Sequence, residues 1–225
     1  MLSFSDFKTR LALSQLKNTH AVDQDIALDA IIDTQEDTIL RLTNEGLLDI
    51  STKMQLFTKQ LDLVFVTDQL IYPITPSGVD VYLFEEYTDT FDEDDFLKII
   101  EVFDSDGKRH HPDTNGHFIT PSYNVLRFTA AKIEELGERI RIRYQARHPI
   151  ITNADNINLP PNLETALQLF VAGLFQAQMN GEEHIKKGNS YYGAYLKHLG
   201  LDEANNNSST SEIDEVDKFT IRGFV

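Results

Sequence analysis

The sequence predicts an α+β protein with three parts: N- and C-terminal helices forming a helical bundle, a central antiparallel β insertion, and an extended C-terminal tail. All seven prolines lie between Pro73 and Pro161, and proline interrupts helices. After Ser51 apolar and polar residues begin to alternate, which is the period of a strand. We therefore expect N-terminal helices over residues 1–50, a β-rich lobe over 51–157, a helical hairpin over 158–200, and a flexible linker with a docking tail over 201–225.

Two helices are expected in the first 50 residues. A short helix over residues 5–16 follows Ser3 or Ser5, either of which is a suitable N-cap. A longer helix is predicted from about Asp23 to Leu47, with Gly46 near its end. Its apolar face comprises Leu28, Ile31, Ile32, Ile39 and Leu42, and the acids Asp23, Asp25 and Asp29 crowd its first turns, where they complement the helix dipole.

The middle of the chain is predicted to form a small antiparallel sheet or barrel. The dipeptide Asp106-Gly107 suits a tight hairpin turn, because glycine tolerates a positive φ. The segment 140–144 alternates, with three arginines near one face when Arg139 just before it is counted. Strands are expected over residues 54–66, 79–83, 96–103, from Arg109 onward, over 125–128 and over 140–144.

A helical hairpin is predicted after Pro160-Pro161, since proline is tolerated in the first turn of a helix. The first helix has a broad apolar stripe, and burying each large member contributes about 1.5–3 kcal/mol. Gly181 breaks this helix, and a second helix extends to Leu199 with Gly200 at its end. The second helix carries Ile185, Tyr192, Tyr195, Leu196 and Leu199, and the hairpin can pack on the N-terminal helices. Candidate residues for packing within the hairpin or for a subunit interface are Leu163, Leu167, Phe170, Leu174, Tyr192 and Tyr195.

Charge and composition exclude several classes of function. The formal net charge of −16 argues against wrapping nucleic acid, which needs clustered Lys and Arg. Eight carboxylates lie between Asp80 and Phe96, and a solvated acidic loop is the simpler interpretation, with a calcium site as the alternative. The absence of cysteine excludes disulfides and thiolate metal sites. With no long apolar run and no signal-like N-terminus, we expect a soluble protein made in the cytosol, with no membrane partner.

Few residues of the sequence point to catalysis. The best cluster of metal-ligand residue types is His110, His111, Asp113 and His117, in a loop rich in Gly, Asn and Pro. A surface loop is the simpler interpretation, because a metal site also needs neighbours that orient the imidazoles. No glycine-rich phosphate loop or nucleophile elbow is present. We expect no catalytic residues, no cofactor and no metal.

The last residues of the sequence have the composition of a docking segment. Residues 202–217 are polar and acidic, with too little apolar surface to fold alone, and are expected to be mobile. The apolar residues that follow alternate in part, as in a strand that adds to a neighbouring sheet edge. The predicted docking residues are Lys218, Phe219, Ile221, Arg222, Phe224 and Val225.

The order of these parts resembles the head-to-tail adaptor (neck or connector) proteins of tailed bacteriophages, of the podophage type. The resemblance rests on the N-terminal helical pair, the β insertion closing with residues 140–149, the segment 159–167 that leads into a helical hairpin, and the ending over 219–225. It covers most of the chain in architecture.

The resemblance implies a structural virion protein of the neck, assembled in the host cytoplasm. Such adaptors form rings, commonly of twelve copies, between the portal protein and the tail or nozzle protein, and DNA passes through the lumen without specific binding. The family has no active site. Two other functions stay open: a metal-dependent hydrolase that uses the His110–His117 loop, and a monomeric acidic binding protein.

Overall fold

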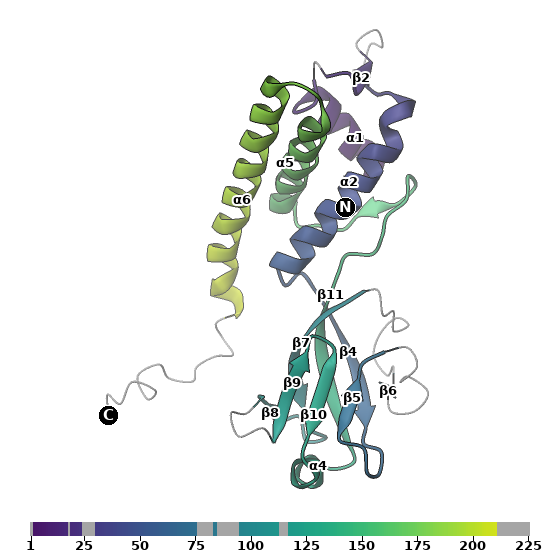
Figure 1. The fold of residues 1–225 in the computed structure, drawn as a ribbon, viewed down its shortest axis with the longest axis vertical. Helices are drawn as coiled ribbons and strands as arrows, with labels where there is room; N and C mark the ends of the chain where they lie inside the picture. The colour runs from purple at the N-terminus through teal and green to yellow at the C-terminus, as the bar shows by residue number, and fades with distance from the viewer. Residues whose placement is uncertain are drawn as a thin grey trace, which may run out of the picture. The chain divides into compact units, whose positions relative to one another are not determined.

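The protein is an α+β protein with helices and antiparallel sheets, as the sequence predicts (Figure 1). The computed structural model describes residues 2–17, 19–23, 30–75, 83–84, 95–112 and 117–210, the last ten by their backbone alone. The chain divides into two compact units. The first unit comprises residues 1–50 and 150–225, and the second comprises residues 51–149.

Helices dominate the described part of the first unit. Two short strand pairs join its connecting segments: β1 (Leu2–Ser3) with β12 (Asn156–Ile157), and β2 (Val22–Asp23) with β3 (Ala30–Ile31). Its helices are α1 (Phe4–Leu13), α2 (Asp33–Lys53), α5 (Pro161–Gln178) and α6 (Glu182–Thr210).

Helix α1 begins where the sequence predicts. The Ser3 side chain accepts a hydrogen bond from the backbone N–H of Asp6 at 3.0 Å, so Ser3 is the N-cap. Phe4, Phe7 and Leu11 are fully buried along one face. The short N-terminal helix is thus confirmed, shifted by a few residues toward the N-terminus.

Helix α2 corrects the predicted helix over residues 23–47. It begins at Asp33, ten residues later, because the described residues before it, 22–23 and 30–31, pair as strands instead. Val22 pairs with Ile31 across β2 and β3, and the N–H of Ile32 donates to the carbonyl oxygen of Ala21 at 2.9 Å. Asp23 is therefore in a strand. The other residues expected in the first helical turns, Asp25, Leu28 and Asp29, lie outside the described residues.

Gly46 is not a helix end, since α2 continues to Lys53. It marks a close approach of α2 to α5: a Cβ at Gly46 would lie 2.6 Å from Cδ1 of Leu167 and 2.8 Å from Cδ1 of Phe170. Both contacts are shorter than real Cβ atoms allow. A larger residue here would force the Leu167 and Phe170 side chains to move, so glycine is favoured by packing rather than by its backbone freedom.

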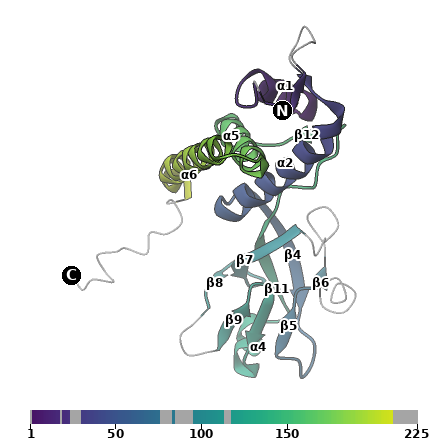
Figure 2. The same cartoon turned by 45° about the horizontal axis from the view of Figure 1, so that its top comes forward.

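Helix α5 begins with Pro161, as predicted, and ten of its residues are buried. The backbone of α5 is in contact with that of α6, and the two helices lie side by side (Figures 1 and 2). A Cβ at Gly188 would lie 2.8 Å from the carbonyl oxygen of Gly173 and 2.9 Å from the nitrogen of Ala177. The connection turns at Gly181, whose φ of 117° favours glycine.

Helix α6 corrects the predicted end of the hairpin. It continues through Gly200 to Thr210, so residues 201–210, predicted to belong to the flexible linker, are helical. A single glycine lowers helix stability by only about 1 kcal/mol, and each following residue adds a hydrogen bond. The linker residues 211–217 and the docking residues lie outside the described residues.

The second unit contains two antiparallel sheets. Five strands lie in the order β6-β4-β11-β7-β8, and three in the order β5-β10-β9. The central strand β11 pairs with β4 through Ile142 and Leu61, and with β7 through Ile142 and Val102. The elements are β4 (Phe57–Val64), β5 (Ile71–Pro73), β6 (Leu83–Phe84), β7 (Phe96–Phe103), β8 (Arg109–His110), β9 (Phe118–Ser122), β10 (Val125–Phe128), α4 (Ala130–Leu136) and β11 (Arg139–Ala146).

Most predicted strands are therefore confirmed, although the segment 79–82 lies outside the described residues. The predicted turn after β7 is present: the N–H of Gly107 donates to the carbonyl oxygen of Asp104 at 3.1 Å, and Gly107 has a φ of 81°. One apolar core unites both sheets, with Tyr72, Phe118 and Phe128 buried in it. The only helix in the described part of this unit is α4, of seven residues.

The contact between α5 and α6 generates a stability prediction. The substitution Gly188→Ala places a methyl group against backbone atoms of α5. Backbone atoms cannot turn aside as the end of a side chain can, so the two helices must move apart. We expect a loss of about 1–3 kcal/mol in the free energy of unfolding, measured by urea denaturation. Gly193→Ala is the matched control on the same helix, because nothing lies within 4 Å of its Cβ position, and it should stabilise by up to about 1 kcal/mol. Equal stability of the two variants would contradict the close contact.

Candidate interaction surfaces

The six residues predicted for hairpin packing or a subunit interface fall into two groups. Leu163, Leu167 and Tyr195 are fully buried within the first unit, and Phe170 is 6% exposed. Leu174 and Tyr192 are partly exposed. The buried members pack inside the chain, so a surface that contacts another molecule must be found on other residues.

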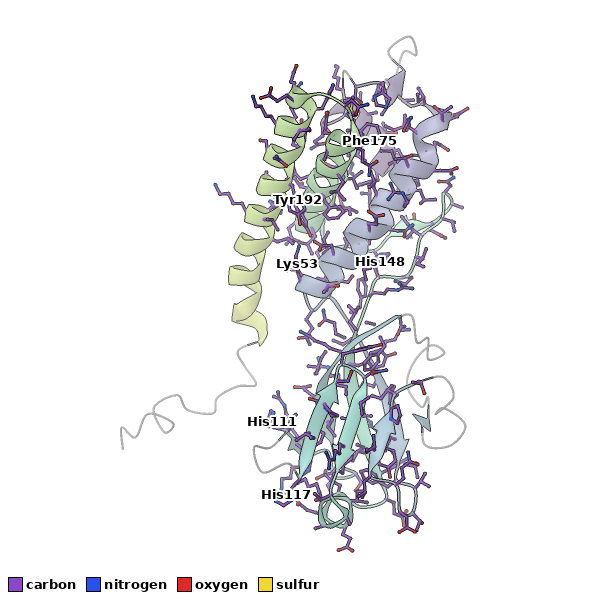
Figure 3. The ribbon with its side chains drawn as sticks, viewed as in Figure 1. Lys53, His111, His117, His148, Phe175 and Tyr192 are labelled. Atoms are coloured by element: carbon purple, nitrogen blue, oxygen red, sulfur yellow. The ribbon has the colours of Figure 1, made fainter. Side chains whose placement is uncertain are left out.

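Tyr195 connects α6 to α2. Its hydroxyl donates a hydrogen bond to Oδ2 of Asp49, and its ring meets that of Phe170 edge-on at 5.1 Å between centroids. Tyr192, on the side of α6 that faces α5, lies beside both rings (Figure 3). Burial, reinforced by the hydrogen bond to Asp49, raises the pKa of Tyr195. The phenol therefore stays protonated and acts as a permanent donor.

A second stripe of α6, beside the buried one, is exposed and partly apolar. Ile185 is 48% exposed and Leu196 is 44% exposed, although both belong to the apolar residues that the sequence places on this helix. A Cβ added at Gly193 or Gly200 would meet no atom within 4 Å, which leaves this side of the helix open. We define the outer stripe of α6 as five exposed residues at helical spacing: Ile185, Asn189, Gly193, Leu196 and Gly200.

The charge near the outer stripe differs from that of the chain as a whole. Residues 182–200 contain three lysines and two glutamates, whereas the whole chain has a net charge of −16. Lys186 and Lys187 pair with Glu182 and Glu183 one turn away. An acidic protein would therefore be repelled less at this surface than at the chain's average surface.

Helix α6 also extends past its hairpin partner. Nε2 of His198 lies 2.6 Å from the carbonyl oxygen of Asn162, in the first turn of α5. Beyond this point the backbone of α6 continues to Thr210, past the end of α5 (Figure 1). The outer stripe therefore lies on a helix whose backbone continues past the first turn of α5.

The arginines of β11 form a ladder of ion pairs on one face of the five-stranded sheet, in line with the sequence pattern. Nε of Arg141 lies 3.0 Å from Oδ1 of Asp62, and Nη1 of Arg143 lies 2.9 Å from Oε2 of Glu101. Arg109 also approaches Glu101, at 3.3 Å. Both carboxylates are buried, so these charges are used to join strands.

The predicted metal-ligand loop has a different geometry from a metal site. Nε2 of His110 lies 2.8 Å from Oδ2 of Asp104, and its Nδ1 lies 3.3 Å from Nζ of Lys132. The hydrogen bond with His110 lowers the pKa of Asp104. Asp113 is outside the described residues. Within the described ranges, no three His, Cys, Asp or Glu side chains are grouped to hold a metal ion.

Most of the acidic loop considered as a calcium site lies outside the described residues. Its last carboxylate, Asp95, pairs with Lys59 and accepts a hydrogen bond from the Tyr144 hydroxyl at 3.4 Å. Asp95 therefore anchors β4 and β11 beside the start of β7.

Comparison with the sequence profiles of protein families and with curated protein sequences finds no match to this chain. Among the helices in the part of the chain that the structure describes, none combines the length and the apolar character needed to cross a membrane.

His148 is a buried titratable group that links the two ends of the second unit. It is 4% exposed, its ring packs edge-on against Phe57 at 5.3 Å, and its backbone N–H donates to Oγ of Ser51 at 3.0 Å. Burial lowers the pKa of His148 below the ordinary value of 6.5. The neutral imidazole is therefore the form that the fold favours.

The lowered pKa predicts a loss of stability in acid. The unfolded chain binds a proton at His148 at a higher pH than the folded chain does. The stability from the neutral ring is complete above about pH 6.5 and is lost as the pH falls through the folded value. We expect His148→Gln to reduce the pH dependence of the unfolding free energy below pH 6.5 by up to about 1.4 kcal/mol per pH unit. His111→Gln, at an exposed position, is the control; an identical pH profile for both variants would contradict the prediction.

Proposed function

We propose that this protein is a head-to-tail adaptor of a tailed bacteriophage. Twelve copies form a ring in the neck of the virion, between the portal protein and the tail or nozzle protein, after assembly in the host cytoplasm. The role is structural, with no catalytic site and no cofactor. The ring forms part of the conduit through which DNA leaves the head during ejection.

The outer stripe of α6 is the observation that carries the proposal. It presents Ile185 and Leu196 to solvent on a helix whose neighbouring stripe, with Tyr195 and Leu199, is already buried. In a ring, each copy meets a neighbour of the same sequence, which carries a net charge of −16. The near-balanced charge around the stripe supports another copy of the chain as its partner, because like-charge repulsion is smallest there.

The division of the chain into two units supports the architecture that the proposal needs. In a ring, helices from both ends of the chain form the bundle that makes the wall, and the β-rich middle is an insertion between them. The C-terminal segment over residues 218–225 is the docking tail. The acidic composition suits a conduit, because a lumen that bound phosphates tightly would retard moving DNA.

Neither alternative function has a specific observation in its favour. For a metal-dependent hydrolase, His110 would have to offer an imidazole nitrogen to the metal, but its two nitrogens face Asp104 and Lys132. In a monomeric acidic binding protein, the exposed apolar residues of α6 would not contact a second copy of the chain.

Charge substitutions in the outer stripe test the ring contact. We expect the double variant Ile185→Asp and Leu196→Asp to remain monomeric in sedimentation velocity, while the parent chain forms a ring, because a buried unpaired carboxylate opposes the contact. The matched control is Leu13→Asp with Ile150→Asp, two apolar positions of the same unit that lie outside α6 and are at least as exposed. Ring formation by the stripe variant, or loss of the ring in the control, would refute the assignment of this surface.

Salt dependence tests how the ring is held together. Acidic copies repel one another, and salt screens this repulsion over about 8 Å at 0.15 M. If apolar contacts hold the ring, assembly should weaken at about 10 mM salt relative to about 150 mM. Sedimentation equilibrium in both buffers measures this, and stronger assembly at low salt would argue against an interface that is mainly apolar.

A further inference from the structure

The second unit contains an open groove that its own fold leaves unfilled. It lies between the loop after β4 and helix α4, with a volume of about 570 Å³. This is within the range of about 300–1,000 Å³ found for binding pockets. Phe65, Val66, Leu70 and Ile133 supply apolar lining, and Leu70 is 43% exposed. We call this feature the β4–α4 groove.

Hydrogen bonds hold the wall of the groove in place before anything binds. The buried Tyr72 hydroxyl accepts from the N–H of Val66 at 3.1 Å and donates to the carbonyl oxygen of Gln69 at 2.8 Å. Between them Asp68 adopts a φ of 64°, which is uncommon for a residue other than glycine. On the other side, the N–H of Phe65 donates to the carbonyl oxygen of Glu138 at 2.9 Å. A shape held in this way lowers the entropy lost on binding.

The rim of the groove is acidic. Asp68, Glu134 and Glu138 line it and are exposed, and no Lys, Arg or His is among the lining residues. None of these three side chains forms an ion pair with another residue in the described ranges. A fitting occupant therefore combines apolar side chains with positive charge.

The chain itself contains a segment of that chemistry. Residues 218–225 include Lys218 and Arg222, no acidic residue, and the large apolar residues Phe219, Ile221 and Phe224. This basic, apolar composition stands out in a chain with 36 acidic and 20 basic residues. We propose that residues 218–225 of one copy bind in the β4–α4 groove of another copy. Phe219 and Ile221 occupy the apolar floor, and Lys218 and Arg222 pair with the acidic rim.

This inference rests on the docking tail of the proposed function and names the surface that receives it. It is separable from the ring, because the groove and the outer stripe of α6 belong to different units. All variants below therefore carry Ile185→Asp and Leu196→Asp, so that association through α6 does not contribute.

A labelled peptide tests the groove directly. The probe is a fluorescein-labelled peptide of residues 216–225, titrated with full-length protein whose own tail carries Phe219→Asp and Ile221→Asp. We expect saturable binding by fluorescence anisotropy, weakened about tenfold or more by Glu134→Lys with Glu138→Lys. The matched control, Asp37→Lys with Asp106→Lys, reverses two exposed carboxylates outside the groove and should bind within about twofold of the parent. No saturable binding, or equal losses in the groove and control variants, would overturn the proposal.

Mixing two defective chains tests whether the tail comes from another copy. One chain has the substituted tail and an intact groove, and the other has the substituted groove and an intact tail. Each alone should sediment as a monomer, and the mixture should contain a heterodimer. Absence of the heterodimer would overturn binding between copies. If the parent chains form a ring but the peptide does not bind, the adaptor proposal stands. Only the binding of the tail in the β4–α4 groove is then refuted.

Discussion

The first unit depends on the burial of α5 between helices that approach it closely. Ten residues of α5 are buried, and the approach is closest where a glycine faces it: Gly46 of α2 on one side and Gly188 of α6 on the other. A side chain at Gly188 would meet the backbone of α5, and one at Gly46 would meet the side chains of Leu167 and Phe170. The exposed side of α6 follows from this packing, because Gly188 determines which face of the helix meets α5.

The sequence predicts the elements whose signals are local. Pro161, the apolar stripe after it and the turn at Gly107 need no distant partner, and all are present. The predicted start of α2 is wrong because its cause is not local: Val22 pairs with Ile31, which converts part of an apparent helical pattern into strand. The predicted end of α6 is wrong because one glycine is a weak helix breaker.

The candidate surfaces are harder to predict than the fold. Helix α6 has two neighbouring stripes at helical spacing, and the aromatic residues belong to the one that faces the rest of the unit. Gly188 is the available sequence signal, since a glycine inside a helix often has a packing reason. The β4–α4 groove has no sequence signal, because its walls come from residues 64–70 and 130–138. Only the folded sheet brings these segments together.

The measurement that tests the central claim most directly is the native mass of the unmodified, full-length chain, alone and with the portal protein. A closed ring of identical copies gives one dominant species, at about twelve times the 25.7 kDa of the chain. The adaptor account predicts this species and its attachment to the portal as an intact ring. A mass of 25.7 kDa at every concentration, unchanged by the portal, would contradict it.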